Sequence, residues 1–426
     1  MDCKIIKNDF INESTYVYKH KSGLTIYISP KEGYSKKCAF FATHFGSINN
    51  CFKEKLSTSF TTIPDGVAHF LEHKLFESET GDAFTKYAQT GASANAYTSF
   101  THTAYYFSCT DKLEENLKIL TELIKTPYFT KENVDKEQGI IGQEINMYLD
   151  NPVWRVYFNL LDAMYKNCPV KKDIAGSIES ISKITPELLY NCYKAFYNAS
   201  NMVLCVCGDV NPNELAEKID VMLDGLTPEI EIESNFEEEP FEVVKSFVEQ
   251  KLEVSMPIFN IGFKDKNTKL SGDAFVKRNI IGKIVLDLLF GRSSKFYNEL
   301  YSEGLINESF DIEYSLESEY GYSLLAGESK NPHKVYEFVL KTLEEYYIAG
   351  ITENELTRQI NIAKSSYICQ FNNIEETARA IMESHFNNYN LYNTLDVYDT
   401  ITTEDINSAI KELKKEFSVL SVINPI

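Results

Sequence analysis

The stretch TPEIEIESNFEEEPFEVV, residues 227–244, lies near the middle of the 426-residue chain. It is rich in glutamate, contains two prolines and shows no sustained apolar periodicity. Segments of this composition are typical of connections between domains. We therefore predict an acidic linker at 227–244, between an N-terminal domain at 1–226 and a C-terminal domain at 245–426.

The two halves of the chain repeat one order of elements when they are read outward from this linker. In the first half, a strand-like run at 38–47, CAFFATHFGS, precedes a helix-like run at 66–77, GVAHFLEHKLFE. In the second half, SMPIFNIGFKD at 255–265 precedes IIGKIVLDLLFG at 280–291. Paired strands rich in tyrosine and a long helix follow in each half. This echo predicts an α+β fold of two homologous domains in tandem.

The composition limits the classes of partner. A formal net charge of -20 argues against binding to nucleic acid or to anionic membrane surfaces, because both need clustered Lys and Arg, and it favours cationic peptides. The sequence has no signal-peptide-like segment and no apolar run near the roughly 20 residues of a membrane span. We expect a cytoplasmic protein that binds neither nucleic acid nor membranes.

Two histidines four residues apart are the strongest candidates for metal ligands. His69 and His73 share one face of the helix expected at 66–77, so both imidazoles can reach one ion. Glu72 lies beside them and can act as a base toward water on that ion. The alternative is a pair of surface histidines, but the apolar neighbours of these residues make unpartnered imidazoles costly.

A third ligand is expected on a second helix. Glu137 and Glu144, in TKENVDKEQGIIGQEINMYLDNP, are seven positions apart and share a helix face. One of them can bind the ion while the other orients a histidine or the water. A solvated acidic stripe is the alternative, and it is weakened by the apolar residues that follow Glu144.

The order His-x-x-Glu-His, the reverse of His-Glu-x-x-His, followed by these glutamates, resembles the insulinase and pitrilysin family of zinc metallopeptidases, which includes the mitochondrial processing peptidases. The resemblance covers essentially the whole chain. It implies that His69, His73 and Glu144 bind Zn²⁺, that Glu72 is the general base and that Glu137 lies behind the ligands. It also implies that each half is a mostly antiparallel sheet covered by helices.

The same resemblance implies a site for substrate. In the family, the strand after the active-site helix is an exposed edge to which an extended peptide adds as a further strand. Asn95, Ala96 and Tyr97 occupy that position here. Ordinary sheet structure is the alternative for these residues, because Tyr and Thr favour strands in any case.

The second half departs from the pattern of an active domain. Lys283, Leu286 and Asp287 align with the first-half motif, so we expect no metal there. Active relatives carry in this half an Arg and a Tyr that grip the substrate, whereas Tyr301 and Asn307 stand at those positions here. Either this chain grips the substrate differently, for example through Arg292 in the preceding turn, or a partner chain supplies the missing pair.

Two functions of different class follow from these observations. The first is a zinc-dependent endopeptidase that hydrolyses unfolded peptides or leader segments, working as a dimer with a homologous chain that lacks HxxEH. The alternative is a non-catalytic or scaffold subunit of a processing-peptidase-like complex. Such a subunit is expected to have lost the motif, whereas this chain keeps His69, Glu72 and His73.

Overall fold

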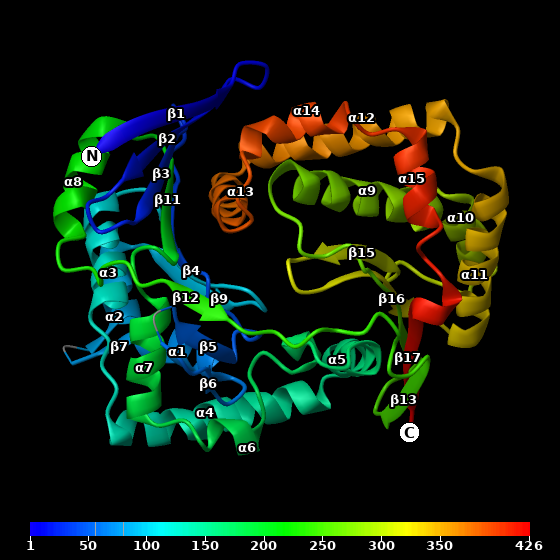
Figure 1. Ribbon diagram of the computed structural model, residues 1–426, viewed down its shortest axis with the longest axis horizontal. Helices are drawn as coiled ribbons and strands as arrows, with labels where there is room; N and C mark the ends of the chain where they lie inside the picture. The colour runs from blue at the N-terminus through cyan, green and yellow to red at the C-terminus, as the bar shows by residue number, and fades with distance from the viewer. Residues whose placement is uncertain (56, 80) are drawn as a thin grey trace. The chain divides into compact units, whose positions relative to one another are not determined.

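The computed structural model describes residues 1–55, 57–79 and 81–426, which form two compact units (Figure 1). The first unit comprises Met1–Ile145, Asp173–Asn235 and Ile368–Tyr392. The second unit comprises Asn146–Lys172, Phe236–Tyr367 and Asn393–Ile426.

The first unit is built on a seven-stranded sheet of order β1-β2-β3-β11-β4-β10-β9. Only β3 and β11 run parallel within it, so the sheet is mixed. The central strands β4 and β11 are almost wholly buried, as their continuous apolar sequences require. The strands are β1 Asp2–Asn8, β2 Glu13–Lys19, β3 Thr25–Pro30, β4 Lys37–Thr43, β9 Ser93–Thr98, β10 Thr103–Cys109 and β11 Met202–Gly208.

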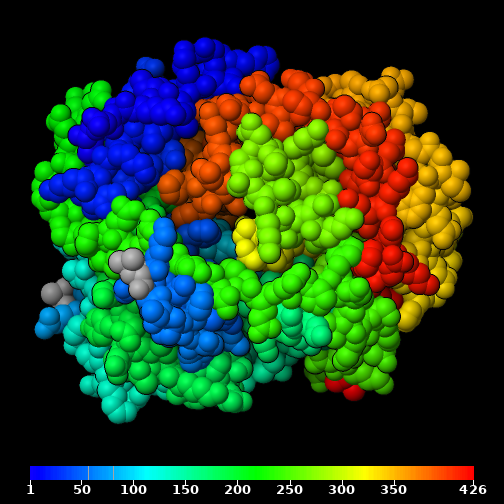
Figure 2. All heavy atoms as spheres, in the orientation of Figure 1, coloured from blue at the N-terminus to red at the C-terminus, as the bar shows by residue number. Residues whose placement is uncertain are grey.

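The two edges of this sheet are β1 and β9. Most side chains of β1 are exposed, and its residues are seen at the surface of this unit in Figure 2. In the described chain, β9 pairs with β10 alone, in the antiparallel register Thr98↔Thr103 to Ser93↔Ser108. One side of the β9 backbone is therefore not part of a strand ladder.

Helices cover both faces of the sheet at β9 and its neighbours. α1 packs against β9 and β10, while α13 packs against β11 and β4 (Figure 1). Successive side chains of a strand point to opposite faces, and Thr98 meets α1 whereas Tyr97 meets α13. The helices that lie wholly or largely in this unit are α1 Val67–Leu75, α2 Ala83–Thr90, α3 Leu113–Lys125, α4 Lys131–Asp150, α6 Ile178–Ile181, α7 Pro186–Phe196, α8 Pro212–Met222 and α13 Ile374–Phe386.

The first unit also contains two small antiparallel sheets. Their strands are β5 Cys51–Glu54, β6 Thr61–Thr62 and β12 Ile232–Ser234 in one, and β7 Glu77–Ser78 and β8 Gly81–Asp82 in the other.

The second unit contains a five-stranded sheet of order β13-β17-β14-β16-β15. β13 and β17 are parallel and the other pairs are antiparallel, which repeats the order and directions of β3-β11-β4-β10-β9. Its strands are β13 Phe247–Leu252, β14 Ile258–Lys264, β15 Asp311–Leu316, β16 Gly321–Glu328 and β17 Ser418–Pro425. Its helices are α5 Pro152–Met164, α9 Gly272–Phe290, α10 Lys295–Ser302, α11 Pro332–Ala349, α12 Glu353–Cys369, α14 Thr394–Tyr398 and α15 Thr403–Ile410. The predicted α+β class is confirmed, with mixed sheets covered by helices.

The compact units do not coincide with the two halves of the chain, because each unit contains a segment from the other half. α13, from the second half, packs on β11 and β4 of the first sheet, and α5, from the first half, packs on β17 and β14 of the second sheet. The predicted domains at 1–226 and 245–426 are continuous in sequence, whereas the compact units are defined by which segments pack together. The domain boundaries therefore stay a prediction.

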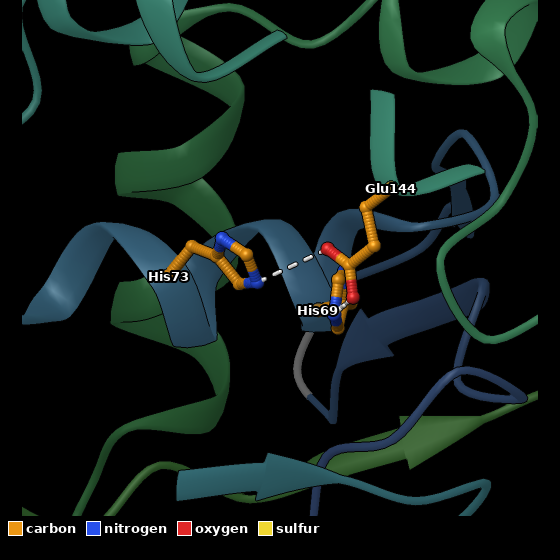
Figure 3. A group of neighbouring side chains, drawn as sticks. All are labelled: His69, His73 and Glu144. Atoms are coloured by element: carbon orange, nitrogen blue, oxygen red, sulfur yellow. Dashed lines mark ion pairs between the residues drawn. The ribbon is translucent and has the colours of Figure 1, made fainter. Parts of the chain in front are cut away.

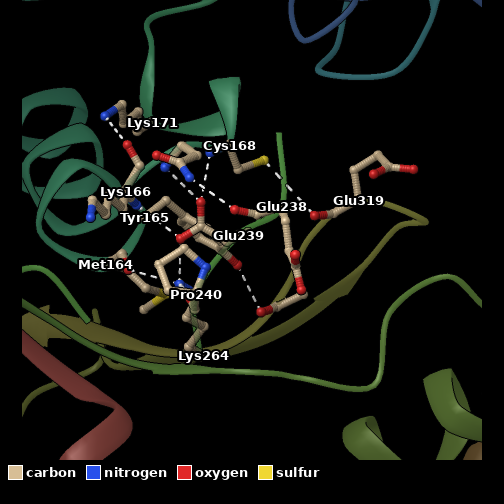
Figure 4. Close-up of polar contacts among 12 residues, drawn as sticks. Met164, Tyr165, Lys166, Cys168, Lys171, Glu238, Glu239, Pro240, Lys264 and Glu319 are labelled. Carbon is tan, nitrogen blue, oxygen red and sulfur yellow. Dashed lines mark hydrogen bonds and ion pairs between the residues drawn. The ribbon is translucent and has the colours of Figure 1, made fainter. Parts of the chain in front are cut away.

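The acidic segment at 227–244 makes specific contacts. β12 within it pairs with β5, and Glu239 accepts hydrogen bonds from the backbone N–H groups of Lys166, Asn167 and Cys168 at 2.9, 2.6 and 2.7 Å (Figure 4). The buried Lys264 ammonium also binds Glu239, at 2.6 Å. The part around Glu239 is therefore held in the second unit by charge-assisted hydrogen bonds.

None of the described helices combines the length and the hydropathy that crossing a bilayer would require. All nine cysteines are free thiols, and Cys38, Cys205 and Cys207 lie buried on β4 and β11.

Candidate metal centre

The helix α1 starts at a glycine for a steric reason. Gly66 has a φ of 93°, which is left-handed, and a Cβ at this position would lie 2.5 Å from the carbonyl oxygen of Ala175. A larger residue would clash with this backbone, so glycine permits the close approach. The helix that follows buries Val67, Phe70 and Leu71, which fixes the orientation of its polar face.

His69 and His73 lie one turn apart on that polar face, with ring centroids 4.6 Å from each other. Glu144 of α4 faces both rings (Figure 3). Its carboxylate oxygens lie 3.7 Å from His69 Nε2 and 3.5 Å from His73 Nε2. The predicted ligands are therefore brought together from two helices that are far apart in sequence.

This donor set fits zinc. Two imidazole nitrogens and one carboxylate oxygen lie within 4.8 Å of one another, and no other group of this kind occurs among the residues that the structure describes. Three protein ligands of these types leave a coordination position open, which is the arrangement of catalytic rather than structural zinc sites.

Glu137 orients His73 instead of joining the ligand group. Its Oε1 lies 3.1 Å from His73 Nδ1, so Nδ1 donates a proton to the carboxylate and Nε2 is left to face Glu144. Burial raises the pKa of Glu137, but the hydrogen bond from His73 and the charge of Lys74 outweigh it and lower that pKa overall.

The pKa values of the two histidines shift in opposite directions, and only His73 has a hydrogen bond to Glu137. Burial lowers the pKa of His69 to about 4, so its ring is neutral near pH 7. Burial also acts to lower the pKa of His73, but the hydrogen bond to Glu137 and the neighbouring carboxylates raise it overall. A metal ligand must be unprotonated at its donor atom, and the neutral ring of His69 has one such nitrogen.

Glu72 lies beside the ligands and is tied to the edge strand. Thr98 Oγ1 of β9 donates a hydrogen bond of 2.6 Å to Glu72 Oε2. Burial raises the pKa of Glu72, and the bond from Thr98 only partly opposes this effect. A carboxylate with a raised pKa is a better proton acceptor at neutral pH.

Two members of the site were missed by the sequence analysis. Thr98 belongs to a strand whose contact with α1 exists only in the tertiary structure. Lys74, directly after His73, has a fully buried side chain that pairs with Glu137 and Glu77. A lysine directly before the apolar pair Leu75 and Phe76 was the one signal that could have pointed to it.

The residues predicted to bind substrate lie on β9, which packs against α1. Asn95 is exposed, while Tyr97 faces α13, where the guanidinium of Arg379 lies 5.3 Å from the centre of its ring. These residues are therefore at an edge strand next to the metal centre.

In the second unit, the positions that align with a substrate-gripping pair make contacts of their own. Tyr301 on α10 stacks on Tyr297 at 5.7 Å between ring centroids, and it is 47% exposed. Asn307 donates a hydrogen bond of 3.0 Å to Glu328. Among the residues that the structure describes, His69, His73 and Glu144 are the group that could hold a metal ion, and the absence of metal ligands from the second half stays a prediction.

Comparison with protein families matches two models to this chain. Residues 60–177, which contain the metal centre, match the model described as Insulinase (Peptidase family M16). Residues 183–363 match the model described as Peptidase M16 inactive domain.

Individual proteins resemble the chain over nearly its whole length. It is 39% identical over 412 residues to the zinc protease YmfH of Bacillus subtilis, which covers 96% of each chain. The structure of an M16-like peptidase from Alicyclobacillus acidocaldarius is similar with a TM-score of 0.94 and 32% identity, covering 99% of this chain and 100% of that one. A chain of Complex III2 from Candida albicans shares the fold, with a TM-score of 0.72, 15% identity and coverage of 96% and 95%.

Proposed function

Because the chain belongs to the M16 insulinase family and is a zinc protease, we propose that it is an endopeptidase acting on unfolded peptides or leader segments. The observation that carries this proposal is the convergence of His69, His73 and Glu144 beside Glu72, next to an edge strand.

Glu72 is the proposed general base. Bound zinc supplies a Lewis acid that polarises the scissile carbonyl group and acidifies water. Glu72 takes the proton from the attacking water and delivers it to the leaving amine. Thr98 donates a hydrogen bond to one carboxylate oxygen of Glu72, and this bond also sets the direction of the other oxygen of Glu72. Glu137 keeps the His73 ring in the orientation that presents Nε2.

The proposed peptide-binding residues are Asn95, Ala96 and Tyr97 of β9. The side of β9 remote from β10 is not part of a strand ladder, so an extended peptide can add there as a further strand, and it would replace the hydrogen bond of 2.9 Å that the Ala96 N–H donates to Asn95 Oδ1. Since Thr98 of the same strand contacts Glu72, a peptide on β9 would lie beside the base. This mode selects unfolded segments because the peptide must be extended.

We also propose that the working form is a dimer with a homologous chain that lacks HxxEH. Support comes from Tyr301 and Asn307, which stand where an Arg and a Tyr would grip the substrate and which contact their own neighbours. The shared topology of the two sheets supports a tandem duplication, with catalytic residues in the N-terminal half alone.

The test uses the purified full chain. We expect one zinc per chain by elemental analysis, and internal cleavage of a long unstructured peptide, identified from product masses. Trimming from the ends would contradict an endopeptidase, and a chain without zinc would contradict the metal site. Matched peptides of equal length rich in Lys or in Glu test the preference for cationic substrates, which the net charge of -20 favours.

The dimer is tested separately by adding the candidate partner. A rise in kcat/KM on addition of a homologous chain without HxxEH is expected if that chain supplies the missing grip. Full activity of the isolated chain, unchanged by the partner, would show that the substrate site is complete without it.

A further inference from the structure

Lys74 is a charged side chain with no exposure to solvent, directly after the metal-binding His73. Its relative side-chain exposure is 0%, and it shares the helix α1 with the buried apolar residues Phe70, Leu71 and Leu75. Burying an ammonium group is unfavourable unless carboxylates pair with it. The position of its partners therefore indicates what the charge is used for.

The partners of Lys74 lead back to the metal centre. Its Nζ lies 3.6 Å from Glu137 Oε2, and it also forms an ion pair with Glu77. The other oxygen of Glu137, Oε1, is the atom that accepts the proton of His73 Nδ1. Glu137 is thus held at one oxygen by Lys74 and holds His73 by the other.

The two carboxylates depend on Lys74 to different degrees. Glu77 is 39% exposed, so water can solvate its charge, and exposed ion pairs contribute little. Glu137 is only 12% exposed, so its second oxygen has little access to water. The loss of Lys74 would therefore affect Glu137 more than Glu77.

We propose that Lys74 is a positioning residue of the metal centre, which acts through Glu137 to fix the ring of His73 with Nε2 toward Glu144. This inference rests on the proposed zinc peptidase function. It assigns no contact of Lys74 with substrate or metal. The ammonium group holds the carboxylate of Glu137 in place, and without it this carboxylate can rotate or draw in water, so that the His73 ring loses its fixed direction.

The test is a double-mutant cycle read out as zinc affinity, measured by competition with a chromogenic chelator. Lys74→Met removes the charge and keeps the chain length, while Glu137→Gln removes the carboxylate. We expect each to weaken zinc binding by about 10- to 100-fold, the range seen when partners behind metal ligands are lost. Because Lys74 acts on His73 only through the carboxylate of Glu137, the double variant should bind zinc no more weakly than Glu137→Gln alone.

Lys31→Met is the matched control. Lys31 is a second buried lysine of the first unit, 5% exposed at its side chain, with its Nζ 2.5 Å from Glu13 and 2.6 Å from the carbonyl of Phe371. Its loss should lower the melting temperature and leave zinc affinity unchanged. Lys74→Met should instead lower zinc affinity and kcat with KM unchanged, because the peptide-binding strand is intact.

The outcomes separate this inference from the function on which it rests. Normal zinc affinity in Lys74→Met, or additive losses in the double variant, would overturn the role of Lys74 while leaving the wild-type peptidase intact. A wild-type chain that neither binds zinc nor cleaves peptides would instead overturn the proposed function. If Lys74→Met does not fold, Lys74→Gln enters the same cycle, with the same expected non-additivity.

Discussion

The helices α1 and α9 are the first helices after the equivalent strands β4 and β14, and each lies beside a cluster of charged side chains. The two clusters differ in the groups that pair with their carboxylates. At α9, Arg278 donates to Asp265 from Nε at 3.1 Å and from its terminal nitrogen at 2.6 Å. The same nitrogen reaches Glu412 at 2.6 Å, and the Tyr314 hydroxyl donates to Asp265 at 2.6 Å. Every carboxylate there has a protein donor.

At α1 the carboxylates outnumber the fixed cations. Glu72, Glu137 and Glu144 lie near the two histidines, and Lys74 pairs with Glu137. Glu144 faces two imidazoles, one of which is neutral because burial lowers the pKa of His69 to about 4. A cluster whose carboxylates are paired with protein donors is suited to stabilising the fold, whereas the convergent imidazole and carboxylate donors at α1 suit a divalent cation.

Removal of one proposed ligand should have the largest effect on the cluster at α1. His73→Ala leaves two donors, so we expect loss of bound zinc and a fall of peptide hydrolysis to the background rate. Elemental analysis and a peptide assay measure these two results. His333→Ala, on α11 of the second unit, is the control and should keep both; retention of one tightly bound zinc by His73→Ala would contradict the assigned ligands.

Loss of the proposed base should leave the metal in place. Glu72→Gln is expected to retain zinc and to lower kcat by about 10²- to 10⁴-fold, since a positioned base contributes that factor. Glu132→Gln, on the exposed first turn of α4, serves as the matched control. Near-normal turnover by Glu72→Gln would mean that another group takes the proton.

Substitution of Arg278 in the cluster at α9 should lower the stability of the protein without changing its zinc content. Arg278→Leu leaves the Asp265 carboxylate, which is 5% exposed, without its cation, and it also removes the cation beside Glu412, which is 29% exposed. Loss of one partner of a buried pair costs about 3–5 kcal/mol. Urea denaturation measures this loss. Arg278→Lys keeps the charge but not the paired geometry, so its loss should be smaller. A change of zinc stoichiometry in either variant would show that the two clusters are coupled.

Acid should destabilise the first unit through its buried imidazoles. Burial lowers the pKa of His102, in the turn after β9, to about 3. The unfolded state, with a pKa near 6.5, binds the proton first as pH falls, so stability present above pH 6.5 is lost toward pH 3. The linkage relation gives a loss of at most about 2 kcal/mol between pH 8 and pH 5.

Substitution of His102 should remove this pH dependence. Unfolding midpoints of His102→Gln at pH 8 and pH 5 should differ less than those of the wild type. His333→Gln, which changes the single histidine of the second unit, should behave as the wild type does. Equal slopes for all three proteins would show that His102 carries none of the acid sensitivity.

The parts of the site that depend on local geometry could be predicted from the sequence. His69, Glu72 and His73 lie within one helical turn and a half, so their common face follows from the period of the helix. The resemblance carried by HxxEH added Glu144 as a proposed ligand and Glu137 as a proposed residue behind the ligands; in the structure Glu144 lies near both histidines and Glu137 bonds to His73. The order of strands and helices likewise predicted two α+β parts.

The features that depend on contacts between distant segments became visible in the tertiary structure and could not be predicted from the sequence. The spacing of Glu137 and Glu144 on one helix leaves open which of them faces the imidazole Nε2 atoms, because that depends on how α4 packs against α1. The anchors Thr98 and Lys74 were invisible for the same reason. The packing of α13 on the first sheet and of α5 on the second also rests on burial between distant segments, which local sequence patterns do not encode.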